Sequence, residues 1–529
     1  MARLSARRPR HRGAGAILAL VALVAVGFLG RGASPAAAVD RTDVKILVGE
    51  PSTFDPAAQS DSNTAAITAQ IYETLTSYDV ALQLQPALAS SWDVASDGRS
   101  VVFHLRPDLA FSDGSSLTAE DVVGSWLRVI DPDRPSPLAA LLLDVQGARA
   151  YLAGQSSDPS TVGLTASGLD VQVQLERPGA DFPAIISAPL FAVVPPTVWR
   201  DGQDAFGPGA VVSGGYVIKA VTADEITLEA NARYWAGAPA ISTVHLVLDI
   251  GGRSPVAAFE AGDLDYTEIS LADAPWIPYD RELGPQLRQT PSLALTYLGL
   301  DTTTKPFDDL RVRQALGAAV DWERVVGLSA FGGQEVARSM VPPAIPGGGD
   351  GSWLPVHDPE HARELLAAAG FPNGAGLPPI TLAAGSAGIA DGIKADLERE
   401  LGMQVELVVL DDHLGRITDD PPNLWLTGWI ADYVGPNDFL GVLLETGSAN
   451  NDAGWSNAAF DAAIAEALAT RDPAASEAAF ERALAKIQDE VPVVPLYLST
   501  DWALSRDGLQ GAWGNGLGIL RMAGMQWAP

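Results

Sequence analysis

Short runs rich in branched hydrophobic residues, bounded by glycine, aspartate or proline, mark the first half of the chain, and this pattern is typical of β-strands. Helical segments lie between some of these runs, and Thr118 followed by Asp121 has the spacing of a capping box at a helix start. Helices are therefore predicted at 65–76 and 119–130. The predicted strands are 44–48, 101–105, 171–175, 216–221, 226–229 and 244–249.

The second half alternates strand-like and helix-like patterns. A strand at 380–384 is followed by a helix at 389–401, whose hydrophobic residues recur every four positions, and by a strand at 405–410. This β-α-β order predicts two parallel strands with a right-handed crossover. The same kinds of signal predict a helix from Asp358 and Pro359 to Gly370, a helix over 460–468, a helix from Asp472 and Pro473 to Pro492, and a strand at 493–498.

Residues 1–38 differ from the rest of the chain. Arginines gather at the start, an apolar run of 14 residues follows at 16–29, and 36–38 offers small residues for cleavage. This order is typical of a secretory signal peptide, and the run is shorter than the ~20 residues of a membrane-spanning helix. We therefore predict cleavage after Ala38 and export to a periplasm or the medium, by the general secretory or the twin-arginine route. An uncleaved segment would instead tether the protein.

Charge and cysteine content exclude several kinds of partner. Without the six arginines of residues 1–38, the chain has 28 basic and 65 acidic residues and a net charge of −37. Such a surface repels phosphate backbones and suits a cationic or zwitterionic ligand, so no nucleic acid is expected. Cysteine is absent, which excludes disulfides, thiolate metal sites and a lipid anchor on cysteine. No cofactor is predicted.

A series of motifs runs in order over nearly the whole chain beyond residue 38. It comprises STFDP, IYETLTSYD, the block PALASSWDVASDGRSVVFHLRPDLAFSDGSSLTAEDVVGSW, SGGYVI, NARYW, AFEAGDLDY, KPFDDLRVRQALGAAVDWERVV, ARELLAAAGF, WIADYVGPNDFL and VPVVPLYL. In this order the motifs resemble the extracellular solute-binding proteins for oligopeptides, dipeptides and nickel, which serve ABC importers. The resemblance implies a binding protein and not an enzyme.

The resemblance also implies an α/β, two-lobed fold of the type II periplasmic-binding-protein kind, with an extra α/β subdomain and a ligand cleft between the lobes. Lobe I would be discontinuous, from 39–76, 212–300 and 500–529, with the extra subdomain at 77–211 and lobe II at 301–499. A length of about 490 residues after cleavage agrees with two or three domains. The implied function is capture of peptides or peptide-like small molecules by a monomer, whose lobes close around the cargo and deliver it to permease subunits.

The motif WIADY carries the candidate ligand site. In peptide-binding relatives its aspartate, here Asp432, receives the peptide α-ammonium group, and charge-assisted hydrogen bonds make a cleft carboxylate suitable for that contact. Asp432 could instead cap a helical segment at 433–440. The preceding strand would offer backbone groups of Gly428 and Ile430 to an extended peptide. The predicted ligand-binding set is Asp432, Gly428, Trp429, Ile430 and, on the opposite side of the peptide, Ser60, Asp61 and Ser62.

The chain departs from relatives that hold the carboxylate of a tripeptide. Where some of them carry a cationic residue, just upstream of the glycine in TGWIADY, this chain has Leu426. A cationic, blocked or longer ligand would therefore fit as well as a peptide of fixed length. The nearby segment has one arginine, Arg416, and the acids Glu406, Asp411, Asp412, Asp419 and Asp420.

There are three alternatives to peptide capture to consider. The cargo could be a non-peptide, such as a nickel chelate or an oligosaccharide, with Trp425, Trp429 and Trp455 packing in the core or lining side-chain pockets. A carboxylate-dependent hydrolase lacks any motif in its favour, since the chain has no G-x-S-x-G, H-E-x-x-H or phosphate-binding loop. A metal site of the protein's own is not predicted, because a helix start separates His357 from His361.

Overall fold

The computed structural model describes residues 41–270, 275–329, 334–348, 351–410, 422–514 and 516–528. Residues 1–38 lie outside these ranges, so a cleaved signal peptide stays a prediction. Arg416 and the acids at 411, 412, 419 and 420 lie outside them as well. In the described ranges, no helix is both long and apolar enough to cross a membrane.

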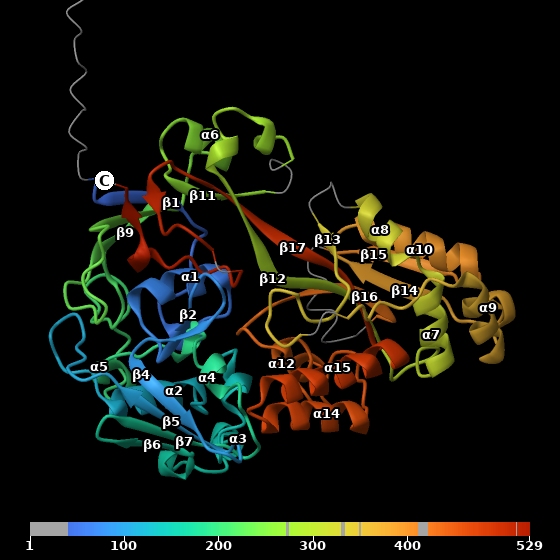
Figure 1. Cartoon of the computed structure of the whole chain (residues 1–529), viewed down its shortest axis with the longest axis horizontal. Coiled ribbons are helices and arrows are strands. Elements are labelled where there is room, and N and C mark those ends of the chain that lie inside the picture. Colours follow the sequence, from blue (N-terminus) through green and yellow to red (C-terminus); the bar gives the residue numbers. More distant parts are fainter. Residues whose placement is uncertain are drawn as a thin grey trace, which may run out of the picture. The chain divides into compact units, whose positions relative to one another are not determined.

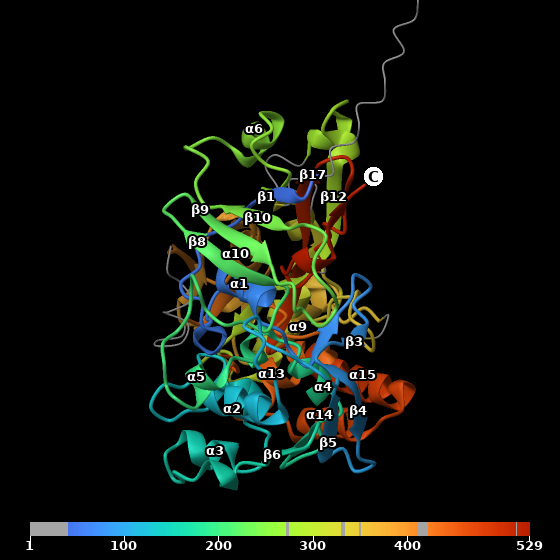
Figure 2. The same ribbon diagram turned by 90° about the vertical axis from the view of Figure 1, so that its left-hand side faces the viewer.

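A mixed sheet of 11 strands organises the chain, in the order β15-β14-β16-β12-β17-β11-β1-β10-β9-β8, with β13 also paired to β17 (Figure 1). The strands β8, β9 and β10 lie side by side at one end of it (Figure 2). The strands of the whole sheet are β1 Asp43–Leu47, β8 Tyr216–Val221, β9 Glu225–Ala230, β10 Thr243–Val247, β11 Tyr266–Ile269, β12 Leu287–Leu300, β13 Glu335–Val336, β14 Ile380–Ala384, β15 Val405–Val409, β16 Leu424–Ile430 and β17 Val493–Ser505.

The two long strands β12 and β17 join the two ends of this sheet. They pair with each other, while β17 also pairs with β11 and β12 also pairs with β16. Their ladder is interrupted between the pair Pro291–Thr500 and the pair Leu295–Leu498. Proline cannot donate a backbone hydrogen bond, which explains why regular pairing stops there. The N–H of Leu293, inside the interruption, donates to the carbonyl of Gly516 at 2.7 Å instead.

A separate four-stranded sheet, β4-β5-β7-β6, carries its own hydrophobic core. Its strands are β4 Ala89–Val94, β5 Ser100–Leu105, β6 Leu164–Ser167 and β7 Asp170–Gln174, and α2 (Ala119–Val129) packs on β6 and β7. Alternate residues of β5 are buried, as its period of two requires. Phe103 of β5 packs edge-on against Trp126 of α2, whose indole N–H donates to the Phe191 carbonyl at 3.0 Å.

Hydrophobic clusters follow this division of the sheets. One lies within residues 75–193. Another combines residues 44–72 with 192–246, Tyr266 and 503–525. Two more draw mainly on residues 293–498. The lobe boundaries inferred from the resemblance stay predictions.

Helix starts agree with the sequence patterns where a local cap defines them. Asp121 accepts a hydrogen bond from the Thr118 N–H at 2.8 Å, which confirms the capping acid of α2. Asp358 and Asp472 cap the helices α9 (Pro359–Ala368) and α15 (Pro473–Glu490). The remaining helices predicted in the second half are α10 (Gly388–Leu401) and α14 (Ala458–Ala469). The parallel pairing of β14 with β15 is confirmed.

Two boundaries predicted from the sequence are wrong. The helix predicted at 65–76 is α1, Ser62–Ile71; Tyr72 is extended, and Thr76 already belongs to β2 (Thr76–Tyr78). The helix starts earlier than predicted because Asp61 caps it, and it ends earlier because Tyr72 is extended and residues 76–78 pair as a strand. The strand predicted at 493–498 continues to Ser505 as β17, because its later residues pair with β11 and β12.

Candidate ligand site

One edge of β16 is open beside the predicted ligand residues. β16 pairs with β12 along its whole length but with β14 only at Leu424 and Trp425. The N–H of Ala431 donates to the Leu293 carbonyl of β12 at 2.9 Å. Because backbone groups alternate in direction along a strand, those of Gly428 and Ile430 face away from β12. In the described part of the chain, no strand pairs with them on that side.

Asp432 follows directly after this open edge. Its carboxylate has no hydrogen-bond or ion-pair partner among the described residues, and burial raises its pKa to about 6. It does not cap the next helix: α12 (Pro436–Phe439) begins after Gly435, with no side-chain cap. The capping alternative for Asp432 is therefore wrong, and the side chain is left facing the cavities described below.

The buried Asp438 lies behind Trp429 and Asp432 and forms hydrogen bonds with both. Its sequence context did not single it out. It is completely buried, and its Oδ2 accepts hydrogen bonds from the Trp429 indole N–H and the Asp432 backbone N–H, both at 3.1 Å. Its Oδ1 has no partner among the described residues. Burial, followed by the nearby charge of Asp432, raises the Asp438 pKa well above its usual value. Asp438 thus positions the two N–H groups, and both burial and the neighbouring carboxylate disfavour its ionised form.

The opposite side of the site is the loop before α1. Asp55 forms a bidentate ion pair with Arg128 of α2, at 3.1 and 2.6 Å, which anchors the loop. Asp61 accepts hydrogen bonds from Ser52 Oγ at 2.6 Å and from Thr64 N and Oγ1 at 2.8 Å. Burial alone would raise the Asp61 pKa, but these hydrogen bonds lower it. Asp61 therefore serves first as the N-cap of α1.

A cavity of about 220 Å³ brings the two predicted sides together. Ser60, Asp61 and Ser62 line it from the loop, and Ile430 and Asp432 line it from the end of β16. The Ile430 side chain is 58% exposed, unusually so for a large apolar residue. Further lining residues are the apolar Ala65, Leu138, Pro189, Leu517 and Ile519, and Gln59, whose buried Oε1 has no partner among the described residues.

A larger cavity of about 640 Å³ lies against the other side of Asp432. Trp429, Asp432 and Tyr433 line it from the β16 side, so Asp432 belongs to both cavities. Its remaining wall includes apolar residues, among them Leu138, Leu141 and Ile185, and the charged residues Asp144, Arg149, Glu176, Arg177 and Glu445.

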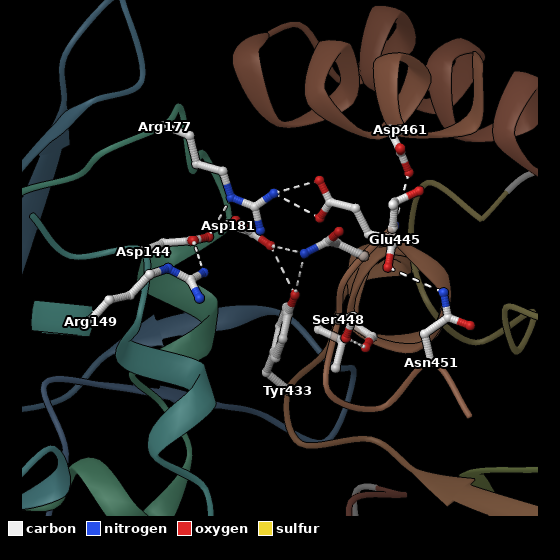
Figure 3. Close-up of polar contacts among 12 residues, drawn as sticks. Asp144, Arg149, Arg177, Asp181, Tyr433, Glu445, Ser448, Asn451 and Asp461 are labelled. Carbon is white, nitrogen blue, oxygen red and sulfur yellow. Dashed lines mark hydrogen bonds and ion pairs between the residues drawn. The ribbon is translucent and has the colours of Figure 1, made fainter. Parts of the chain in front are cut away.

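Polar contacts at and beside the larger cavity join segments far apart in sequence (Figure 3). Arg177 Nε donates to Asp144 Oδ2 at 2.6 Å, and Arg177 Nη1 donates to both Glu445 oxygens at 2.8 and 2.7 Å. Asp181 accepts hydrogen bonds from the Tyr433 hydroxyl at 2.9 Å and the Asn437 amide at 3.2 Å. These contacts tie residues after β7 to residues after β16. No local pattern in the sequence pointed to them.

The other candidates have structural surroundings. Trp425 is buried in the core, and the indole N–H of Trp455 donates to Glu490 at 2.9 Å. Of the three tryptophans near the cleft segment, Trp429 alone lines a cavity described above. No group of three histidine, aspartate or glutamate side chains in the described ranges could hold a metal ion.

Known proteins resemble this chain over most of its length. It is 28% identical over 474 residues to YgiS of Escherichia coli (strain K12), described as a probable deoxycholate-binding periplasmic protein, with 85% of this chain and 86% of YgiS covered. It is 28% identical over 517 residues to the periplasmic oligopeptide-binding protein OppA of the same organism, with 92% of each covered. The unliganded open form of the murein tripeptide-binding protein MppA matches with a TM-score of 0.77, 24% identity, and 92% and 97% coverage.

The structural neighbours are periplasmic binding proteins of mixed α/β architecture, so the fold is the predicted two-lobed one. The family model for bacterial extracellular solute-binding proteins, family 5, matches residues 83–451 and includes the whole β16–Asp432 segment. The protein belongs to the family 5 bacterial extracellular solute-binding proteins.

Proposed function

We propose that the protein captures peptides or peptide-like molecules outside the cytoplasm and delivers them to the permease subunits of an ABC importer. The single observation that supports this most is the unpartnered carboxylate of Asp432 at the end of an open strand edge. A partly buried carboxylate without a counter-charge is costly for the fold, and a ligand cation supplies what it lacks. The family is one of binding proteins, which agrees with capture and not catalysis.

The ligand would bind in two ways at once. Its α-ammonium group would donate charge-assisted hydrogen bonds to Asp432. Its extended backbone would then add to β16 through the outward groups of Gly428 and Ile430, as a further strand. A Cβ at Gly428 would meet only the Leu295 carbonyl at 3.5 Å and the Thr296 hydroxyl at 3.9 Å, so packing does not demand glycine there. The missing side chain leaves the strand edge accessible to a ligand.

Ser60 and Ser62 would contact the ligand from the loop side. Both are exposed in the unliganded protein and line the smaller cavity. We infer a smaller part for Asp61, because Ser52 and Thr64 already occupy its carboxylate.

Non-peptide cargo divides into two classes at this site. An anionic amphiphile such as a bile acid would bring a carboxylate near Asp432 or leave that charge unpaired, and like charges at close range are unfavourable. A cationic or zwitterionic molecule would satisfy it. The site therefore favours cargo with an amino group, and a nickel chelate or oligosaccharide would have to bind without using Asp432.

A thermodynamic cycle tests the peptide assignment. Calorimetry would compare tri-alanine with its N-acetylated form on the wild type and on Asp432→Ala, with the exposed Asp391→Ala of α10 as the control. Removing one side of such a pair costs ~2–5 kcal/mol, which is a roughly 30- to 5,000-fold loss of affinity. Acetylation should weaken binding strongly in the wild type and little further in Asp432→Ala, because both changes remove one contact. Losses that simply add would contradict a direct contact.

A further inference from the structure

We propose that the larger cavity is a subsite for a basic side chain on the first residue of the ligand, so that the preferred cargo carries two positive charges at its amino end. This inference rests on the proposed function, because it takes the ligand ammonium at Asp432 as its starting point. To that function it adds the chemical class of the side chain on the first residue of the ligand, which would be lysine or arginine.

The placement follows from how the two cavities meet. Asp432 is a wall of both, while the exposed Ile430 at the open strand edge lines the smaller one. A peptide backbone paired to β16 would therefore run through the smaller cavity. With its ammonium at Asp432, the first residue stands at the junction, and its side chain can enter the larger cavity of about 640 Å³.

The walls of the larger cavity match a long basic side chain. Leu138, Leu141 and Ile185 provide apolar surface, and Trp429 adds an aromatic ring held by Asp438. Lysine and arginine bury their methylene stems against such surface while the cationic head reaches polar groups. Among the charged residues that line this cavity, the four carboxylates of Asp144, Glu176, Glu445 and Asp432 outnumber the two guanidinium groups of Arg149 and Arg177.

Among the described residues, two carboxylates that line this cavity have no ion-pair partner. The Arg177 guanidinium contacts both Asp144 and Glu445, and Arg149 lies 3.5 Å from Asp144. The two guanidinium groups are thus balanced by those two acids. Among the described residues, the Glu176 carboxylate accepts only the Gly147 N–H, at 3.2 Å, while the Arg99 guanidinium donates to the Glu176 backbone carbonyl at 2.8 Å. The Asp432 carboxylate accepts nothing from them. One cation of the ligand would balance Asp432, and a second would balance Glu176.

An acidic first residue is disfavoured by the same arrangement. It would add a negative charge beside Glu176, and both guanidinium groups already have partners. The net charge of −37 beyond residue 38 acts in the same direction over longer range, since it raises the local concentration of cationic ligands.

The test compares three tripeptides of equal length by calorimetry: Lys-Ala-Ala, norleucine-Ala-Ala and Glu-Ala-Ala. Norleucine keeps the lysine stem and removes its charge. Lys-Ala-Ala should bind about tenfold more tightly than norleucine-Ala-Ala, and Glu-Ala-Ala more weakly than either. Because Glu176 is exposed, added salt should reduce the preference for lysine.

Two variants should move the lysine-to-norleucine ratio in opposite directions. Glu176→Gln removes the unbalanced carboxylate and should lower the ratio to about threefold or less, whereas Arg149→Gln removes a cation and should raise it. The exposed Glu282→Gln, outside both cavities, should leave the ratio unchanged. Equal affinity for the lysine and norleucine peptides, with Asp432 still required, would overturn this subsite and leave the proposed function standing. Binding of none of the three peptides would overturn both.

Discussion

Two carboxylates face the same small cavity and differ in what holds them. Asp61, on the loop side, accepts hydrogen bonds from Ser52 and Thr64 and caps α1. Asp432, across the cavity, has no side-chain partner in the described part of the structure. Both side chains are partly buried. The Asp432 carboxyl group is the more deeply buried of the two, so the carboxylates differ both in hydrogen bonding and in depth of burial.

The two pKa values move in opposite directions for that reason. Hydrogen bonds lower the Asp61 pKa against the effect of burial, whereas burial acts unopposed at Asp432 and raises its pKa. A carboxylate with internal partners stabilises the fold. One without them keeps its hydrogen-bonding capacity for a ligand, at a cost to stability. The comparison suggests that the missing partners, and not the residue type, mark the binding residue.

The largest expected effect is on the pH dependence of binding. With a pKa of about 6 in the free protein, only the ionised Asp432 can pair with the ligand ammonium, which stays protonated below about pH 7.5. Affinity for Lys-Ala-Ala should be nearly constant between about pH 7 and 7.5 and should fall about tenfold for each pH unit below 6. Calorimetry at several pH values measures this. The dependence should vanish in Asp432→Asn, and a slope that persists there would assign it to another group.

The next effect concerns the buried acid behind Asp432. Asp438→Ala removes the acceptor of the Trp429 and Asp432 N–H groups, and the unsatisfied donors should lower the free energy of unfolding by about 1–3 kcal/mol. Asp438→Asn keeps a neutral oxygen acceptor and should lose well under half of that. Urea unfolding of both variants tests the assignment. Equal losses would show that an oxygen acceptor alone does not account for the role of Asp438.

A smaller effect on the free energy of unfolding is expected at Asp432 itself, where a substitution should stabilise the protein. Because the Asp432 pKa is raised in the folded protein, the unfolded chain loses this proton at a lower pH than the folded one. The folded state is therefore destabilised as the pH rises from about 4 through about 6. Asp432→Asn should therefore stabilise the unliganded protein at pH 7 by about 1–2 kcal/mol, less than the full shift implies because the side chain is partly exposed. The gain should disappear near pH 4, where the carboxyl is protonated in both states. Urea unfolding at the two pH values measures it.

The smallest expected effect is on the stability of Asp61 variants, and it distinguishes the role of Asp61 from that of Asp432. Asp61→Ala removes a helix cap and should lower the free energy of unfolding by about 1 kcal/mol. Asp61→Asn, which can still cap, serves as its control. The preference for a free over an acetylated peptide amine should survive in Asp61→Ala. If that preference is lost as it is in Asp432→Ala, Asp61 also carries ligand charge.

Local features of this protein were predictable from its sequence. The caps at Asp358 and Asp472 and the parallel β14–β15 pair are as expected, because a cap involves residues only two or three positions apart and a short crossover joins neighbouring strands. The end of α1 at Ile71 and the extension of β17 to Ser505 were not. After α1, residues 76–78 pair with residues 84–86 in a hairpin, whereas the later part of β17 pairs with the distant strands β11 and β12. The motif order led to the family, but through resemblance and not through physical pattern.

Only the tertiary structure decided which residues meet. Asp432 and the 60–62 loop come together from positions about 370 residues apart in the sequence, and Arg177 reaches Glu445 across 268 positions. The sequence alone determined that carboxylates are abundant, cysteine absent and the helices locally capped. Which carboxylate is paired, neutral or available depends on burial and on partners that folding brings from elsewhere in the chain. That is why Asp438 and Glu176 had no signal in the sequence, while their roles follow from their neighbours in space.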